Sequence, residues 1–169
     1  MKEVRPTTGM VLQALFNILG DLRRKSFLDL FSGTGKVAFE ACRRGASPVV
    51  SVELIRSRSQ DIWKKNRYDC HTHLSMDVRK GLSWVARRDM VFDVVFADPP
   101  YGEKWGRSLP ELLASRSSIV ARDGVIVIER SVDDKLAVPD PWILRDERKY
   151  GRSVLSFLSW SVNEEEVPS

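Results

Sequence analysis

The chain has 169 residues, of which 43% are hydrophobic and 30% charged, and its formal net charge is +4. This composition excludes a disordered polymer and predicts one globular domain over residues 1–162. No apolar run approaches the roughly 18 residues of a membrane-spanning helix, so we expect no membrane partner.

The charge balance bears on partners and location. Glu164, Glu165 and Glu166 fall in a polar segment, 163–169, which we expect to be a disordered acidic tail. The rest of the chain is therefore more basic than the total suggests. That surplus favours a polyanionic partner, although solubility alone explains it equally well. Cys42 and Cys70 lack C-x-x-C spacing, which predicts structural thiols in a reducing cytoplasm and no metal site.

Apolar residues recur at helical spacing near the start of the chain. They predict a helix after Arg5-Pro6-Thr7-Thr8, with Thr7 or Thr8 as its cap and Gly20 as its stop. Strands and helices alternate from there. The predicted strands are Ser26–Phe31, Val49–Val52, His73–Met76, Phe92–Ala97 and Val125–Glu129. The predicted helices are Lys36–Arg44, Arg56–Tyr68, Val78–Arg87 and Gly106–Ser115.

This alternation predicts an α/β fold, with a mostly parallel sheet and helices on both faces. The end of the chain follows another pattern, because Trp142–Lys149 and Val154–Trp160 are strand-like and no helix separates them. Around Tyr150-Gly151 they predict an antiparallel hairpin at the sheet edge.

The most informative stretch is Phe92–Tyr101, an apolar strand that ends in Asp98-Pro99-Pro100-Tyr101. Proline cannot continue a ladder, so this turn lies at the carboxyl end of a strand, where ligands bind in open α/β sheets. Asp98 and the carbonyl of Pro99 can each accept an N–H of an exocyclic amine. Tyr101 offers a ring to a base taken out of its stack. A plain turn is the alternative, but a carboxylate, two prolines and an aromatic directly after such a strand favour the functional interpretation.

A glycine loop follows the first predicted strand, as Asp29-Leu30-Phe31-Ser32-Gly33-Thr34-Gly35. The spacing excludes a P-loop, since Leu30 and Val37 occupy two of its required positions. It partly meets a dinucleotide fingerprint. Asp29 argues against that ligand, because its carboxylate repels a pyrophosphate and attracts the ammonium group of S-adenosylmethionine.

Further carboxylates follow the next predicted strands. Glu53 can bind both ribose hydroxyls, and Asp77 can accept the adenine amino group while Val78 packs on the ring. Each is also explained as a helix cap, Asp77 above all. Four strands ending in carboxylates beside a glycine loop together favour a cationic ligand. His71 and His73 are expected to be surface or core residues.

With these motifs, the chain resembles the RsmD-like family of 16S (small-subunit) rRNA guanine-N2 methyltransferases. The matching segments are RPTT, QALFNIL, FLDLFSGTGKVAFEACRRGA, VVSVE, FDVVFADPPY and KYG, in the family's order. The resemblance implies a class I, Rossmann-like methyltransferase fold of seven strands. It also implies S-adenosylmethionine as cofactor, S-adenosylhomocysteine as product, and 16S rRNA or an assembling small subunit as partner.

The resemblance also assigns site residues. The implied cofactor residues are Arg5, Thr7, Thr8, Asp29, Phe31, Gly33, Gly35, Glu53, Leu54, Asp77, Val78 and Asp98. The implied catalytic residues, which hold the target guanine, are Asp98, Pro99, Pro100 and Tyr101. The enzyme is expected to be monomeric. Two alternatives stay open: a DNA adenine-N6 methyltransferase, which uses the same turn, and a non-catalytic RNA-binding protein with this fold.

Overall fold

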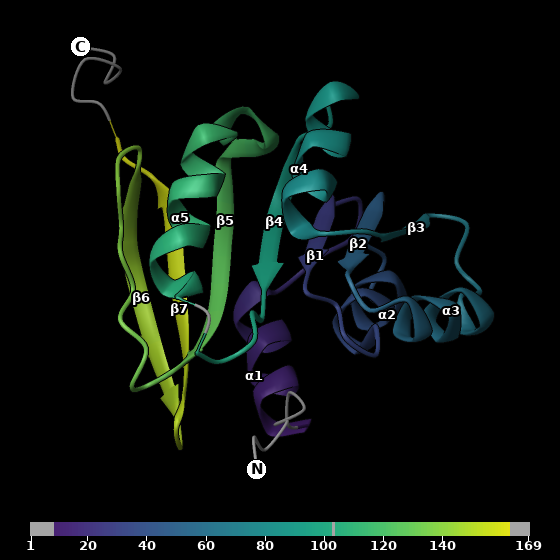
Figure 1. Ribbon diagram of the computed structural model, residues 1–169, viewed down its shortest axis with the longest axis horizontal. Coiled ribbons are helices and arrows are strands. Elements are labelled where there is room, and N and C mark those ends of the chain that lie inside the picture. The colour runs from purple at the N-terminus through teal and green to yellow at the C-terminus, as the bar shows by residue number, and fades with distance from the viewer. Residues whose placement is uncertain (1–8, 103, 163–169) are drawn as a thin grey trace.

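The computed structural model describes residues 9–102 and 104–162 and shows one seven-stranded sheet flanked by helices (Figure 1). The helices are α1 (Gly9–Leu19), α2 (Lys36–Arg43), α3 (Arg56–Lys65), α4 (Val78–Arg87), α5 (Trp105–Ser115) and the short η1 (Ser117–Ile119). The strands are β1 (Phe27–Leu30), β2 (Val49–Glu53), β3 (His71–Ser75), β4 (Phe92–Ala97), β5 (Val120–Ser131), β6 (Trp142–Tyr150) and β7 (Ser153–Trp160).

The strand order is β3-β2-β1-β4-β5-β7-β6. Strands β1 to β5 pair in parallel, whereas β7 lies antiparallel between β5 and β6. This arrangement confirms the predicted α/β fold with a C-terminal antiparallel hairpin. The order reverses between β1 and β4, so the carboxyl ends of these two strands form the topological switch point, where such sheets bind ligands.

Alternating residues of the central strands fill two separate apolar cores. Leu28, Leu30 and Ala97 face α4 and α5, whereas Phe27 and Phe96 face α1 and α2. The strands are therefore apolar on both sides, as buried parallel strands are. Within the described residues, no helix has the length and apolar character needed to cross a bilayer.

Two predicted boundaries are wrong because the backbone turns earlier than the apolar pattern suggests. Strand β1 ends at Leu30 because Phe31 adopts a positive φ of 60° and begins the glycine loop. Helix α3 ends at Lys65, three residues before the predicted end at Tyr68. Asn66 is extended and its side chain accepts a hydrogen bond from the amide of Tyr68, which replaces a further helical turn.

Two predicted strands are too short. Strand β5 begins at Val120 rather than Val125, because an irregularity in its pairing with β4 lets the polar residues before Val125 continue the ladder. Strand β3 begins at His71 rather than His73 and ends at Ser75. Of the surface and core positions expected for its two histidines, the structure shows the core, since both are buried.

The buried histidines form a polar layer inside the sheet. The Ser51 Oγ lies 2.7 Å from His71 Nε2 and 2.6 Å from His73 Nδ1, and Ser59 Oγ lies 2.8 Å from His73 Nε2. Burial lowers the pKa of each imidazole from its usual 6.5 to about 4. Both histidines therefore have a structural role in the core.

The first turn of α5 packs directly on the segment between β5 and β6. The amide of Ala137 donates to the carbonyl of Gly106 at 2.8 Å. A Cβ at position 106 would lie 2.1 Å from the carbonyl oxygen of Lys135. Only glycine permits this approach, which fixes the spacing between the two segments.

The two histidines give a pH prediction. A lowered pKa means that the unfolded chain binds more protons between pH 6.5 and 4, so their contribution to stability is present above about pH 6.5 and is lost toward pH 4. Because the chain has two histidines, their ring proton resonances in NMR can be followed separately. We expect neither to titrate above about pH 5. A midpoint near 6.5 for either ring would contradict the buried layer.

The contact at Gly106 gives a second prediction. Gly106→Ala forces the backbone of α5 away from Lys135, and we expect a loss of about 1–3 kcal/mol of unfolding free energy in urea melts. Gly9→Ala is the matched control, since a Cβ there meets no atom of the described residues within 4 Å. It should leave the urea midpoint unchanged or raise it. Equal midpoints for the two variants would show that the contact is not tight.

Candidate active site

Three predicted site carboxylates lie together at the carboxyl edge of the sheet. Asp29 pairs with Ser51 of β2 and Phe96 of β4, so the alternation places its side chain on the face covered by α1 and α2. Glu53 lies two residues after Ser51, and Asp98 lies two residues after Phe96, so both side chains lie on the same face as Asp29. The charges of Asp98 and Glu53 both act on the Asp29 carboxyl. The structure thus brings the three residues into one cluster, at the switch point.

Asp29 is the most buried of them, with 1% of its surface exposed. Its Oδ2 accepts from the amide of Ala38 at 3.2 Å, while Oδ1 is buried and makes no hydrogen bond within the described residues. Burial raises the pKa of Asp29 well above its usual value, and the neighbouring charges of Asp98 and Glu53 raise it further. An acceptor atom with no donor, among like charges, marks a place for a cationic hydrogen-bond donor.

The glycine loop lies directly beside Asp29. Gly33 and Gly35 adopt φ values of 57° and 85°, a region open to glycine without strain. A Cβ on Gly33 would meet no atom of the described residues within 4 Å, so none of these side chains covers the backbone there. The buried Oγ of Ser32 also has no hydrogen-bond partner among the described residues. The loop therefore presents its backbone to an approaching ligand.

Glu53 connects the glycine loop to the turn after β2. Its Oε1 accepts from the amide of Gly33 at 2.9 Å, and its Oε2 accepts from the amide of Ile55 at 2.7 Å. The Arg58 Nη1 lies 3.9 Å from Oε1. Both oxygens keep lone pairs for further donors such as ribose hydroxyls. Leu54 beside it is 66% exposed, which suits an apolar contact with a ligand.

Asp77 and Val78 have structural roles in the described chain. Asp77 caps α4, with its side chain accepting from the amide of Arg79 at 2.8 Å. Val78 is the first residue of α4, and its side chain is buried in the core. This is the alternative that the sequence left open for Asp77. The predicted contacts of both residues with adenine stay predictions.

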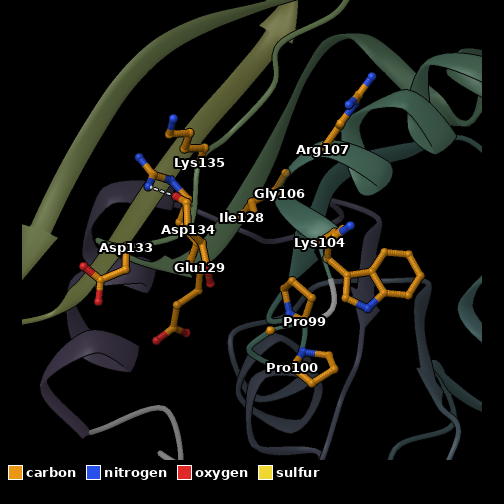
Figure 2. Close-up of a pocket in the computed structure, with 13 residues that line it drawn as sticks. Pro99, Pro100, Lys104, Gly106, Arg107, Ile128, Glu129, Asp133, Asp134 and Lys135 are labelled. Carbon is orange, nitrogen blue, oxygen red and sulfur yellow. Dashed lines mark hydrogen bonds between the residues drawn. The ribbon is translucent and has the colours of Figure 1, made fainter.

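The Asp98-Pro99-Pro100-Tyr101 turn follows β4 and borders a cavity of about 300 Å³. The amide of Asp98 donates to the carbonyl of Leu30 at 3.4 Å, which ties the turn to β1. Tyr101 is 37% exposed. Figure 2 shows Pro99 and Pro100 across the cavity from Glu129, with Lys104 above them. The turn thus faces a space that can admit a planar group.

Of the residues that line this cavity, sequence reasoning predicted only Pro99 and Pro100, and it missed Trp105 and Glu129 among others. Trp105 lies in its wall, packed edge-on against Phe31 at 5.0 Å between ring centroids and covered by the Arg79 guanidinium at 4.8 Å. Glu129, at the end of the predicted fifth strand, also lines the cavity. Glu129 could have been found, because it repeats the pattern of a strand followed by a carboxylate. Trp105 gives no such signal.

Three predicted cofactor residues, Arg5, Thr7 and Thr8, lie outside the described residues, as does the predicted tail at 163–169.

Comparison with known proteins gives the family. The family model described as conserved hypothetical protein 95 matches residues 1–159. The ribosomal RNA small subunit methyltransferase D of Escherichia coli K12 is 28% identical over 151 residues, which is 88% of this chain and 76% of that protein. The putative rRNA methyltransferase YlbH of Bacillus subtilis is 30% identical over 142 residues, which is 80% of this chain and 75% of that protein.

Solved structures agree with this result. A putative methyltransferase, yhhF, from Escherichia coli superposes with a TM-score of 0.80 at 25% identity, covering 92% of this chain and 88% of that one. SMU.776, a putative methyltransferase complexed with SAH, has a TM-score of 0.67 at 18% identity, covering 88% and 48%, and shows the shared fold. The chain therefore belongs to the RsmD-like family of methyltransferases, on a class I fold.

Proposed function

We propose that this protein transfers a methyl group from S-adenosylmethionine to the exocyclic N2 amine of a guanine in small-subunit rRNA. One observation carries the proposal: the buried Oδ1 of Asp29 has no donor within the described residues and lies among the charges of Asp98 and Glu53, at the sheet edge where the Asp98–Tyr101 turn begins. The names of the relatives support the rRNA substrate. The guanine-N2 position rests on the resemblance to the RsmD-like family, because the turn itself also suits an adenine-N6 amine.

The described residues suit this cofactor. Asp29 would accept a hydrogen bond from its α-ammonium group, Glu53 would bind the ribose hydroxyls, and the open backbone at Gly33 would let the amino-acid part approach. An ammonium group also offsets the repulsion among the carboxylates. When bound, S-adenosylmethionine supplies an electrophilic methyl group on a positively charged sulfur.

The proline turn would position the nucleophile. The amine of a nucleobase is a poor nucleophile because its lone pair is delocalised into the ring. Asp98 and the Pro99 carbonyl can each accept one of its N–H groups, which directs the lone pair toward the methyl carbon. Catalysis then comes mainly from positioning and from a matched electrostatic environment.

Basic residues around the cavity would meet the RNA backbone. Lys104, Arg107 and Lys135 line the cavity and are exposed. Arg107 also forms an exposed ion pair with Glu111, with 3.7 Å between Nε and Oε1. These exposed cations make this side of the cavity suited to phosphate contacts. We infer a monomeric enzyme acting in the cytoplasm, where ribosomal subunits assemble.

The role of Asp98 is tested by methyl transfer. Asp98→Ala removes one acceptor of the amine, so we expect tritiated methyl incorporation into 16S rRNA to fall at least about 100-fold. Binding of S-adenosylhomocysteine should change by no more than a few-fold. Asp123→Ala, an exposed carboxylate near the other end of the parallel strands, is the matched control and should keep full activity.

The same assay separates the alternatives. Transfer to duplex DNA in place of rRNA would favour the adenine-N6 methyltransferase. Failure to bind S-adenosylmethionine, with no transfer to any substrate, would favour a non-catalytic RNA-binding protein. Full turnover by Asp98→Ala would remove Asp98 from the mechanism.

A further inference from the structure

We propose that Glu129 recognises the target base as guanine by accepting a hydrogen bond from its N1–H, an inference that rests on the proposed function. Glu129 was not among the predicted site residues. It would act as a specificity residue beside Asp98, with the two carboxylates binding neighbouring N–H groups on the Watson–Crick edge of one base.

The sheet register places Glu129 next to Asp98. Ala97 of β4 pairs in parallel with Ile128 of β5, so Asp98 and Glu129 are the next residues on adjacent strands. Adjacent strands lie about 4.8 Å apart. Asp98 lies two residues after Phe96, and Glu129 lies two residues after Val127. Phe96 and Val127 both belong to the core on the α1 and α2 face. The alternation therefore directs the two side chains to the same face of the sheet.

Burial distinguishes Glu129 from the other acidic residues of the cavity. It is 5% exposed although it lines the cavity, whereas the Asp133 side chain is 74% exposed and paired with Arg152. Figure 2 shows Glu129 on the opposite side of the cavity from Pro99 and Pro100. A buried carboxylate interacts far more strongly with a donor than an exposed one does.

Glu129 already interacts within the protein. A carboxylate has about four acceptor positions, so it can keep such a contact and still bind a base.

The chemistry of the base selects guanine. Guanine carries an N1–H directly beside its N2 amine, so two adjacent acceptors, Asp98 and Glu129, match two adjacent donors. Adenine has a lone pair at N1, which a carboxylate repels. A site that hydrogen-bonds one base edge rejects an analogue lacking that donor, because its own polar group is left without a partner. Glu129 thus favours guanine-N2 over adenine-N6 chemistry.

The test uses a base analogue that keeps the reacting amine. 2-Aminopurine has the 2-amino group but no N1–H. After the methylated nucleotide has been mapped, small-subunit rRNA would be ligated with guanine or 2-aminopurine at that position. We expect the wild-type protein to prefer guanine by about 10- to 100-fold in kcat/KM. In Glu129→Ala this ratio should fall to within about 3-fold of one.

A purely structural role for Glu129 predicts another result, since the variant would then lose activity on both RNAs and keep the ratio. Glu129→Gln has a neutral amide oxygen, which is a weaker acceptor, so it should lower the ratio of guanine to 2-aminopurine kcat/KM less than Glu129→Ala does. This variant replaces Glu129→Ala in the test if that variant does not fold. Glu111→Gln, 57% exposed on α5, is the control and should keep the wild-type ratio.

An unchanged ratio in a folded Glu129 variant, or no guanine preference in the wild type, overturns the proposal. Absence of any transfer by the wild-type protein to the guanine RNA refutes the proposed function itself.

Discussion

The site depends on one unfavourable arrangement, a buried carboxylate that lies among other carboxylates and has an oxygen with no donor within the described residues. Taking a charged group out of water costs free energy, and neighbouring like charges add to that cost. This cost raises the pKa of the Asp29 carboxyl. In addition, its Oδ1 accepts no hydrogen bond from the described residues. Such an arrangement is retained where a ligand supplies the missing charge and the missing hydrogen bond.

The fold explains why these carboxylates meet. Parallel strands end at the same edge of a sheet, and side chains two residues apart share a face. The strand order and the alternation of side chains therefore bring together four carboxylates that are distant in sequence: Asp29, Glu53, Asp98 and Glu129. The glycine loop and the proline turn stop the strands there, and the close contact at Gly106 fixes the wall of the adjoining cavity.

Local patterns made much of this predictable from sequence. The glycine loop, the proline turn and the alternation of strands with helices are encoded in short segments, so the fold class and the positions of Asp29, Glu53 and Asp98 could be predicted. Tertiary burial was harder to predict. The sequence left surface and core positions both open for His71 and His73, and their burial depends on hydrogen bonds with Ser51 of the neighbouring strand. Trp105 joins the cavity through contacts with Phe31 and Arg79, which no sequence spacing indicates.

The central claim is that Asp29 is held for a cation, and calorimetry of S-adenosylhomocysteine binding between pH 5 and 7 tests it most directly. This ligand has the α-ammonium group but no sulfonium charge, so it isolates the proposed contact. Binding an ammonium group lowers the raised pKa of Asp29. We expect the affinity of the wild-type protein to rise with pH and protons to be released on binding. Asp29→Asn should bind about 10- to 100-fold more weakly at pH 7 and release none. A wild-type affinity independent of pH, together with equal binding by Asp29→Asn, would contradict the account.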